Sequence, residues 1–115
     1  MASAKLAKAV DALSALAHEG RLSVFRLLVR AGPDGVAAGD IARKLDILPN
    51  TLSASLTVLA HAGLVQSRRE GRSIIYTADY ERMRGLLGFL MEDCCNGEAS
   101  ICAPLAAIAA RAACC

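Results

Sequence analysis

The chain has 115 residues, of which 55% are hydrophobic and 21% are charged, so it suits one folded domain and is too apolar for a disordered or collagen-like chain. No apolar run reaches the roughly 20 residues that a membrane span requires, and residues 1–10 lack the pattern of a secretory signal, so we expect a cytoplasmic protein without a membrane partner. The formal net charge is only +2, but residues 1–84 contain 12 of the 13 basic residues, which permits a polyanionic partner.

Three helices are predicted in the first 48 residues. Apolar side chains recur at helical spacing over residues 5–17 and again over residues 22–29, and the second helix ends in the Gly- and Pro-containing segment 31–35. A short third helix follows, and either Asp40 or Gly39 is expected to cap its first turn. A tight turn then leads into the next element.

The second half of the chain predicts a helix, a hairpin and a last helix. Pro49 suits the first position of the fourth helix, which Gly63 ends, and β-prone segments within residues 64–77 flank a Gly-containing turn. Asp79 can cap the last helix, which ends at a pair of cysteines. The order is therefore ααααββα, a mainly α (α+β) chain with the elements of a winged helix-turn-helix.

The fourth helix has one apolar and one small polar face. Three leucines at positions 52, 56 and 59 mark its buried side, and the opposite side has Asn50, Thr51, Ser53, Ala54 and Thr57. Such a surface can approach the major groove of double-stranded DNA closely, because small polar groups reach base edges and phosphates. An ordinary solvated face would have the same composition.

The hairpin has a cluster of basic residues around its tip, namely Arg68, Arg69 and Arg72. Guanidinium groups there can straddle a phosphate backbone or enter a minor groove. Charge on a soluble edge strand is the simpler alternative. Because the hairpin directly follows a helix-turn-helix, we interpret it as the wing of a winged helix.

Three segments resemble the ArsR/SmtB family of bacterial metalloregulatory repressors: residues 15–22 (ALAHEGRL), 40–42 (DIA) and 50–65 (NTLSASLTVLAHAGLV). The resemblance covers nearly the whole chain. It implies a winged-helix homodimer that binds its own promoter region and releases it when an ion binds. The family often has His where this chain has Ala54 and Ser55, which leaves the operator sequence open, and Leu48 is a poor N-cap for the fourth helix.

The first and last helices both have apolar stripes, and one small core formed by the other helices cannot cover them all. We therefore expect a homodimer through these two helices, which would present two recognition helices to successive major grooves about 34 Å apart. Packing of both helices on their own core is the alternative.

All five cysteines follow residue 93, so we divide the chain into a DNA-binding and dimerisation domain (1–92) and a cysteine-rich tail (93–115). The adjacent Cys94 and Cys95 can be joined by Cys102 through a turn at Asn96-Gly97. Three thiolates suit As(III) or Sb(III) as an inducer, whereas zinc normally takes a fourth ligand. The motif also resembles arsenite-responsive family members. Solvent-facing thiols without a ligand role are the alternative, and we expect Cys114 and Cys115 to be dispensable rather than additional ligands.

These features predict a repressor that releases its operator when As(III) or Sb(III) binds, which derepresses arsenic-resistance genes. Two alternative hypotheses remain. The protein could be a thiol-redox sensor with a Cys95–Cys102 disulfide, or a metalloid-binding module without DNA binding. We expect no enzyme and no catalytic cofactor, because the sequence has neither a nucleophile with a partnered base nor a phosphate-binding glycine loop. His18 and His61 are expected to have structural or phosphate-side roles.

Overall fold

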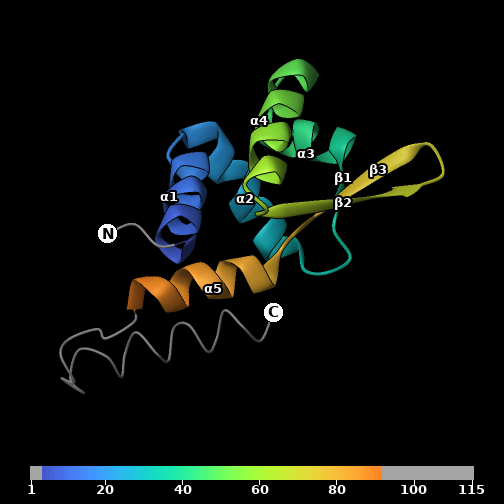
Figure 1. The fold of residues 1–115 in the computed structure, drawn as a ribbon. Helices are drawn as coiled ribbons and strands as arrows, with labels where there is room; N and C mark the ends of the chain where they lie inside the picture. Colours follow the sequence, from blue (N-terminus) through green and yellow to red (C-terminus); the bar gives the residue numbers. More distant parts are fainter. Residues whose placement is uncertain (1–3, 92–115) are drawn as a thin grey trace.

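The computed structural model describes residues 4–91, in which five helices and three strands follow one another. They are α1 (Ala4–Leu16), α2 (Glu19–Ala31), β1 (Val36–Ala37), α3 (Ala38–Leu45), α4 (Pro49–His61), β2 (Val65–Glu70), β3 (Ser73–Ala78) and α5 (Tyr80–Met91). The winged helix-turn-helix prediction is confirmed, and the β2–β3 hairpin extends away from the helical body (Figure 1). The five cysteines and the predicted tail lie outside the described residues.

The first helix packs through its smallest side chains. Ala9, Ala12 and Ala15 are buried, and at most 4% of each is exposed. The break before α2 is built by His18, whose Nδ1 accepts hydrogen bonds from the backbone N–H groups of Gly20 (3.1 Å) and Arg21 (3.3 Å). His18 therefore acts as a side-chain N-cap, which confirms the structural role expected for it.

A short strand, β1, was not predicted. It adds to the hairpin to give an antiparallel sheet in the order β1-β3-β2, with Val36 opposite Tyr76. Gly35, just before it, has a φ of 78°, and a Cβ there would lie 2.6 Å from the carbonyl oxygen of Tyr76. Only glycine fits this close approach. Two residues are too few to show the alternation that identifies a strand in a sequence.

The cap predicted for the third helix was wrong. The extended Ala37 (φ −67°, ψ 147°) is the N-cap and has no side-chain hydrogen bond, because β1 runs directly into α3. Asp40 instead lies inside the first turn and forms an ion pair with Arg43. The helix ends at Asp46, which adopts the left-handed conformation and donates its backbone N–H to Ala42 and Arg43.

The turn between α3 and α4 sets the start of the recognition helix. Pro49 occupies its first turn, and Leu48 is an N-cap without a side-chain hydrogen bond, as the sequence predicted. The predicted leucine stripe is buried, since Leu52, Leu56 and Leu59 are 2%, 3% and 0% exposed. The stripe fixes which face of α4 points away from the protein.

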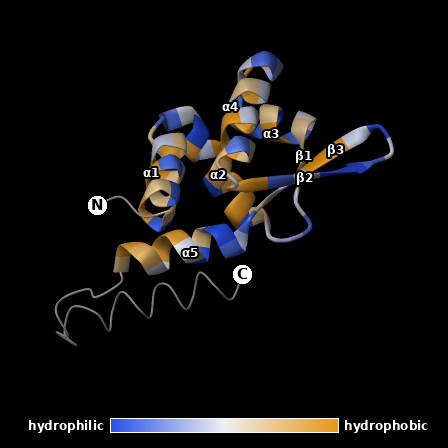
Figure 2. Cartoon of the chain, viewed as in Figure 1, coloured by the Kyte–Doolittle hydropathy of each residue, from blue (hydrophilic) through white to orange (hydrophobic). Residues whose placement is uncertain are grey.

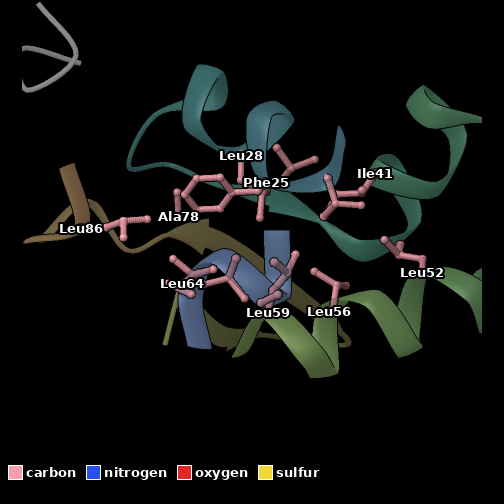
Figure 3. Packing of buried hydrophobic residues seen from close by; sticks show 14 of the residues in the cluster. Phe25, Leu28, Ile41, Leu52, Leu56, Leu59, Leu64, Ala78 and Leu86 are labelled. Atoms are coloured by element: carbon pink, nitrogen blue, oxygen red, sulfur yellow. The ribbon is translucent and has the colours of Figure 1, made fainter. Parts of the chain in front are cut away.

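The core lies where α2, α3 and α4 meet. Its largest fully buried side chains are Val24, Leu28, Ile41, Leu59 and Leu64, most of which are labelled in Figure 3. The last helix joins this core through Leu86, and its start is capped by Asp79, whose Oδ1 accepts a hydrogen bond from the backbone N–H of Arg82 (3.0 Å). No helix within residues 4–91 is long and apolar enough to cross a membrane.

Candidate nucleic-acid interface

The predicted small polar face of α4 lies on the surface. All five of its residues are exposed: Asn50, Thr51, Ser53, Ala54 and Thr57. One of the hydroxyls is engaged within the helix, because Thr57 Oγ1 donates to the carbonyl oxygen of Ser53 at 2.9 Å. The structure therefore places this face where DNA could reach it, and contact with DNA itself stays a prediction.

The first turn of α4 offers backbone donors beside these side chains. Leu48 supplies no side-chain cap, and the first N–H groups of an α-helix have no acceptor within the helix. The N–H groups of Asn50 and Thr51 are therefore directed out of the positive end of the helix, where they can donate to a phosphate oxygen. The poor cap noted in the sequence is thus compatible with a surface that binds an anion.

The three wing arginines differ in their surroundings. Arg68 is held at two points: its Nε donates to Glu70 Oε2 at 2.6 Å, and its Nη2 donates to the carbonyl oxygen of Asp34 at 2.7 Å. Arg69 and Arg72 are exposed, and no residue within 4–91 forms a hydrogen bond or ion pair with their side chains. The predicted trio therefore divides into one arginine that fixes the wing and two that are available to a phosphate backbone.

Arg82 is a further arginine whose side chain is held by hydrogen bonds, and the sequence predicts no role for it. Its Nη2 donates to the carbonyl oxygen of Lys8 in α1 at 2.7 Å, and its Nε donates to the carbonyl oxygen of Ala62 at the end of α4 at 3.3 Å. It thus connects α5 with α1 and with the recognition helix. An arginine in an amphipathic helix gives no sequence signal for such contacts, because it is normally solvated.

The apolar stripes expected at the dimer interface are exposed in the single chain. On α1 the exposed fractions of Leu6, Val10 and Leu13 are 40%, 52% and 42%, and on α5 that of Leu90 is 52%. Figure 2 shows hydrophobic colour on α1 and along the second half of α5, which lie on the side away from the wing tip. A patch of this kind on adjacent helices is typical of a surface that a partner covers.

The described residues provide no metal centre of their own. No group of three His, Cys, Asp or Glu side chains within residues 4–91 is placed to hold a metal ion. His61 and Asp11 line an open hollow of about 640 Å³ between α1 and α4, but they are only two such groups. The predicted ligands Cys94, Cys95 and Cys102 lie outside the described range and stay a prediction.

Residues 16–68 match the family described as a helix-turn-helix domain. The transcriptional activator HlyU of Vibrio cholerae is 30% identical over 84 residues, which are 73% of this chain and 75% of that protein. The structure of reduced HlyU is 34% identical and has a TM-score of 0.58, and the match covers 73% of this chain and 88% of that one.

Two further solved structures have a similar fold. An ArsR-like transcriptional regulator from Rhodococcus sp. RHA1 is 27% identical with a TM-score of 0.67, and the match covers 89% of this chain and 90% of that one. The homodimeric winged helix-turn-helix DNA-binding domain of Mb0332 from Mycobacterium bovis is 31% identical with a TM-score of 0.61, covering 76% and 82%. The chain therefore belongs to the ArsR/SmtB family of winged helix-turn-helix transcriptional regulators.

Proposed function

We propose that the protein is a repressor that binds double-stranded operator DNA as a homodimer and releases it when As(III) or Sb(III) binds. The observation that supports DNA binding best is the exposed small polar face of α4 beside a wing with two available arginines, Arg69 and Arg72. The helix would enter the major groove and read base edges, while the wing arginines contact phosphates. Membership of a family of winged helix-turn-helix transcriptional regulators also supports DNA binding.

The homodimer follows from the exposed apolar face on α1 and α5. Covering Leu6, Val10, Leu13 and Leu90 with the same face of a second copy would remove them from water. A two-fold axis through this face would hold two copies of α4 in a fixed relation, so that they reach major grooves about 34 Å apart. The solved winged helix-turn-helix domain of Mb0332 is homodimeric, which supports the association of two copies.

The inducer site is proposed from the sequence of residues 94–102. Adjacent cysteines have Cα atoms about 3.8 Å apart, and a third thiolate from Cys102 would complete a three-sulfur site for a soft metalloid ion. The pair follows α5 closely, since that helix ends at Met91. Ligation is expected to shift the interface formed by α5 and α1 and so change the spacing of the two recognition helices.

Oxidation of thiols is the second candidate trigger. One of the solved relatives is reduced HlyU, which favours a redox trigger as the alternative to a metalloid. A disulfide between Cys95 and Cys102 would avoid the strain of a bridge between adjacent cysteines. The same winged helix would then respond to an oxidant instead of a metalloid.

Two alanine-to-glutamate substitutions, one on α4 and one on α2, test DNA binding. Ala54→Glu places a carboxylate on the proposed groove face, and like-charge repulsion from phosphate should lower operator affinity by about 2 kcal/mol, roughly 30-fold. Ala31→Glu makes the same change at an exposed position at the end of α2, off the assigned face, and should leave affinity within about threefold. Fluorescence anisotropy with labelled DNA from upstream of the gene measures both. Equal losses in the two variants would contradict the assigned face.

A further inference from the structure

A second hollow of the molecule lies between α2 and α5, away from the face assigned to DNA. It is a groove of about 340 Å³. Its floor includes the buried side chains Phe25, Leu64 and Leu86, which are labelled in Figure 3. Met83 and Leu87 of α5 form further apolar lining. The volume and the lining are those of a site for a small apolar group.

Two arginines give this groove a charge. Arg26 and Arg30 lie one turn apart on α2, both are exposed, and both line the groove. No side chain within residues 4–91 forms an ion pair with either of them. Glu19 lines an adjoining hollow of about 220 Å³ together with the same arginines, and it too forms no ion pair with them. The groove therefore combines an apolar floor with two positive charges to which no residue of the described part of the chain forms an ion pair.

This combination selects one chemical class of ligand. An apolar chain or ring would gain by leaving water along Phe25, Met83 and Leu87. A carboxylate at its end would accept hydrogen bonds from guanidinium groups, whose planar donor geometry matches its two oxygens. A neutral apolar molecule would leave both charges unused, and a cation would be repelled.

We propose that the α2–α5 groove is a binding site for a small amphipathic carboxylate, with its charged end at Arg26 and Arg30 and its apolar part along the floor. The ligand would contact both α2 and α5. The α1 and α5 face assigned to the dimer uses other side chains, Leu6, Val10, Leu13 and Leu90, so the groove need not close when two copies associate. The proposal rests on the fold and is independent of the metalloid response.

Calorimetric titration of the full-length reduced protein with decanoate tests the proposal. Decanoate should bind at least about tenfold more tightly than decanol, which has the same chain length without the charge. The double variant Arg26→Gln/Arg30→Gln should lose about tenfold or more in decanoate affinity. The matched variant Arg69→Gln/Arg72→Gln removes the same charge from the wing and should bind decanoate as the unmodified protein does.

The apolar half of the site has its own test. Leu22 lines the groove and is 41% exposed, so Leu22→Gln should keep the fold and weaken decanoate binding several-fold. Circular dichroism would check that each variant is folded. The proposal would be overturned if the full-length protein did not bind decanoate, which would also be the result if another part of the chain or a second copy filled the groove. It would also be overturned if decanol bound as tightly as decanoate, or if the two arginine double variants lost equal decanoate affinity.

Discussion

At the scale of single residues, neighbours in the sequence have different tasks. Arg68 and Arg69 are adjacent on β2, yet the first is fixed by Glu70 and by the carbonyl oxygen of Asp34, while the second is free to meet a phosphate. The sequence predicts a phosphate contact for both, because both are basic residues near a turn. The contact of Arg68 with Asp34, 34 residues away in the loop before β1, leaves no signal in the sequence.

The double variant Arg69→Gln/Arg72→Gln should weaken operator binding about tenfold. Each neutralised phosphate contributes about 0.9 to the slope of log affinity against log salt. The loss of two contacts in each protomer should therefore lower the slope for the dimer by about 4. Anisotropy titrations at several salt concentrations measure both effects. Arg26→Gln/Arg30→Gln removes the same charge away from the wing and is the control. An unchanged slope in the wing variant would show that these arginines do not contact phosphate.

At the scale of elements, the helices could be predicted from their apolar patterns, whereas the strand β1 and the N-cap of α3 could not. The leucines of α4 at i, i+4 and i+7 identify its buried face, and Asp79 identifies the start of α5. The strand β1 depends on pairing with a segment about 40 residues later, and Ala37 caps α3 only because β1 precedes it. Such tertiary effects leave no local pattern.

The contacts of Arg82 belong to the same scale, since one side chain connects three helices. Arg82→Met should lower the free energy of unfolding by about 1–3 kcal/mol, because it removes charge-assisted hydrogen bonds to the carbonyl oxygens of Lys8 and Ala62. Arg84→Met, on the same helix, loses only an exposed ion pair with Glu81 and should change stability by less than about 1 kcal/mol. Urea unfolding measures both. Equal changes in the free energy of unfolding of the two variants would contradict the structural role assigned to Arg82.

At the scale of the whole molecule, the proposed dimer would decide whether two recognition helices act together. The sequence predicted apolar stripes on the first and last helices, and the structure divides that of α1 into a buried alanine face and an exposed face of larger side chains. Which apolar residues face inward could not be derived from spacing alone, because both faces of α1 are apolar. The cysteine site could be predicted only as a motif, and its geometry is outside the described residues.

Val10→Asp should convert the dimer into monomers at micromolar concentration, because it would bury a carboxylate at the centre of the apolar face. Sedimentation velocity measures the change, and operator affinity should fall with it. Ile74→Asp alters a residue on β3 that is 41% exposed and should leave the dimer intact. A Val10→Asp protein that still sediments as a dimer would place the interface elsewhere.

The response to arsenite is the most direct test of the proposed function. Reduced protein bound to labelled DNA from upstream of its gene is titrated with arsenite and followed by fluorescence anisotropy, beside the Cys94/Cys95/Cys102→Ser variant. A Cys114→Ser/Cys115→Ser variant is the matched control. Arsenite should lower operator affinity about 5- to 150-fold in the unmodified protein and in the control, and should leave it unchanged in the triple variant. The proposed function would be contradicted if arsenite released DNA from the triple variant, or if peroxide released DNA from the unmodified protein and arsenite did not.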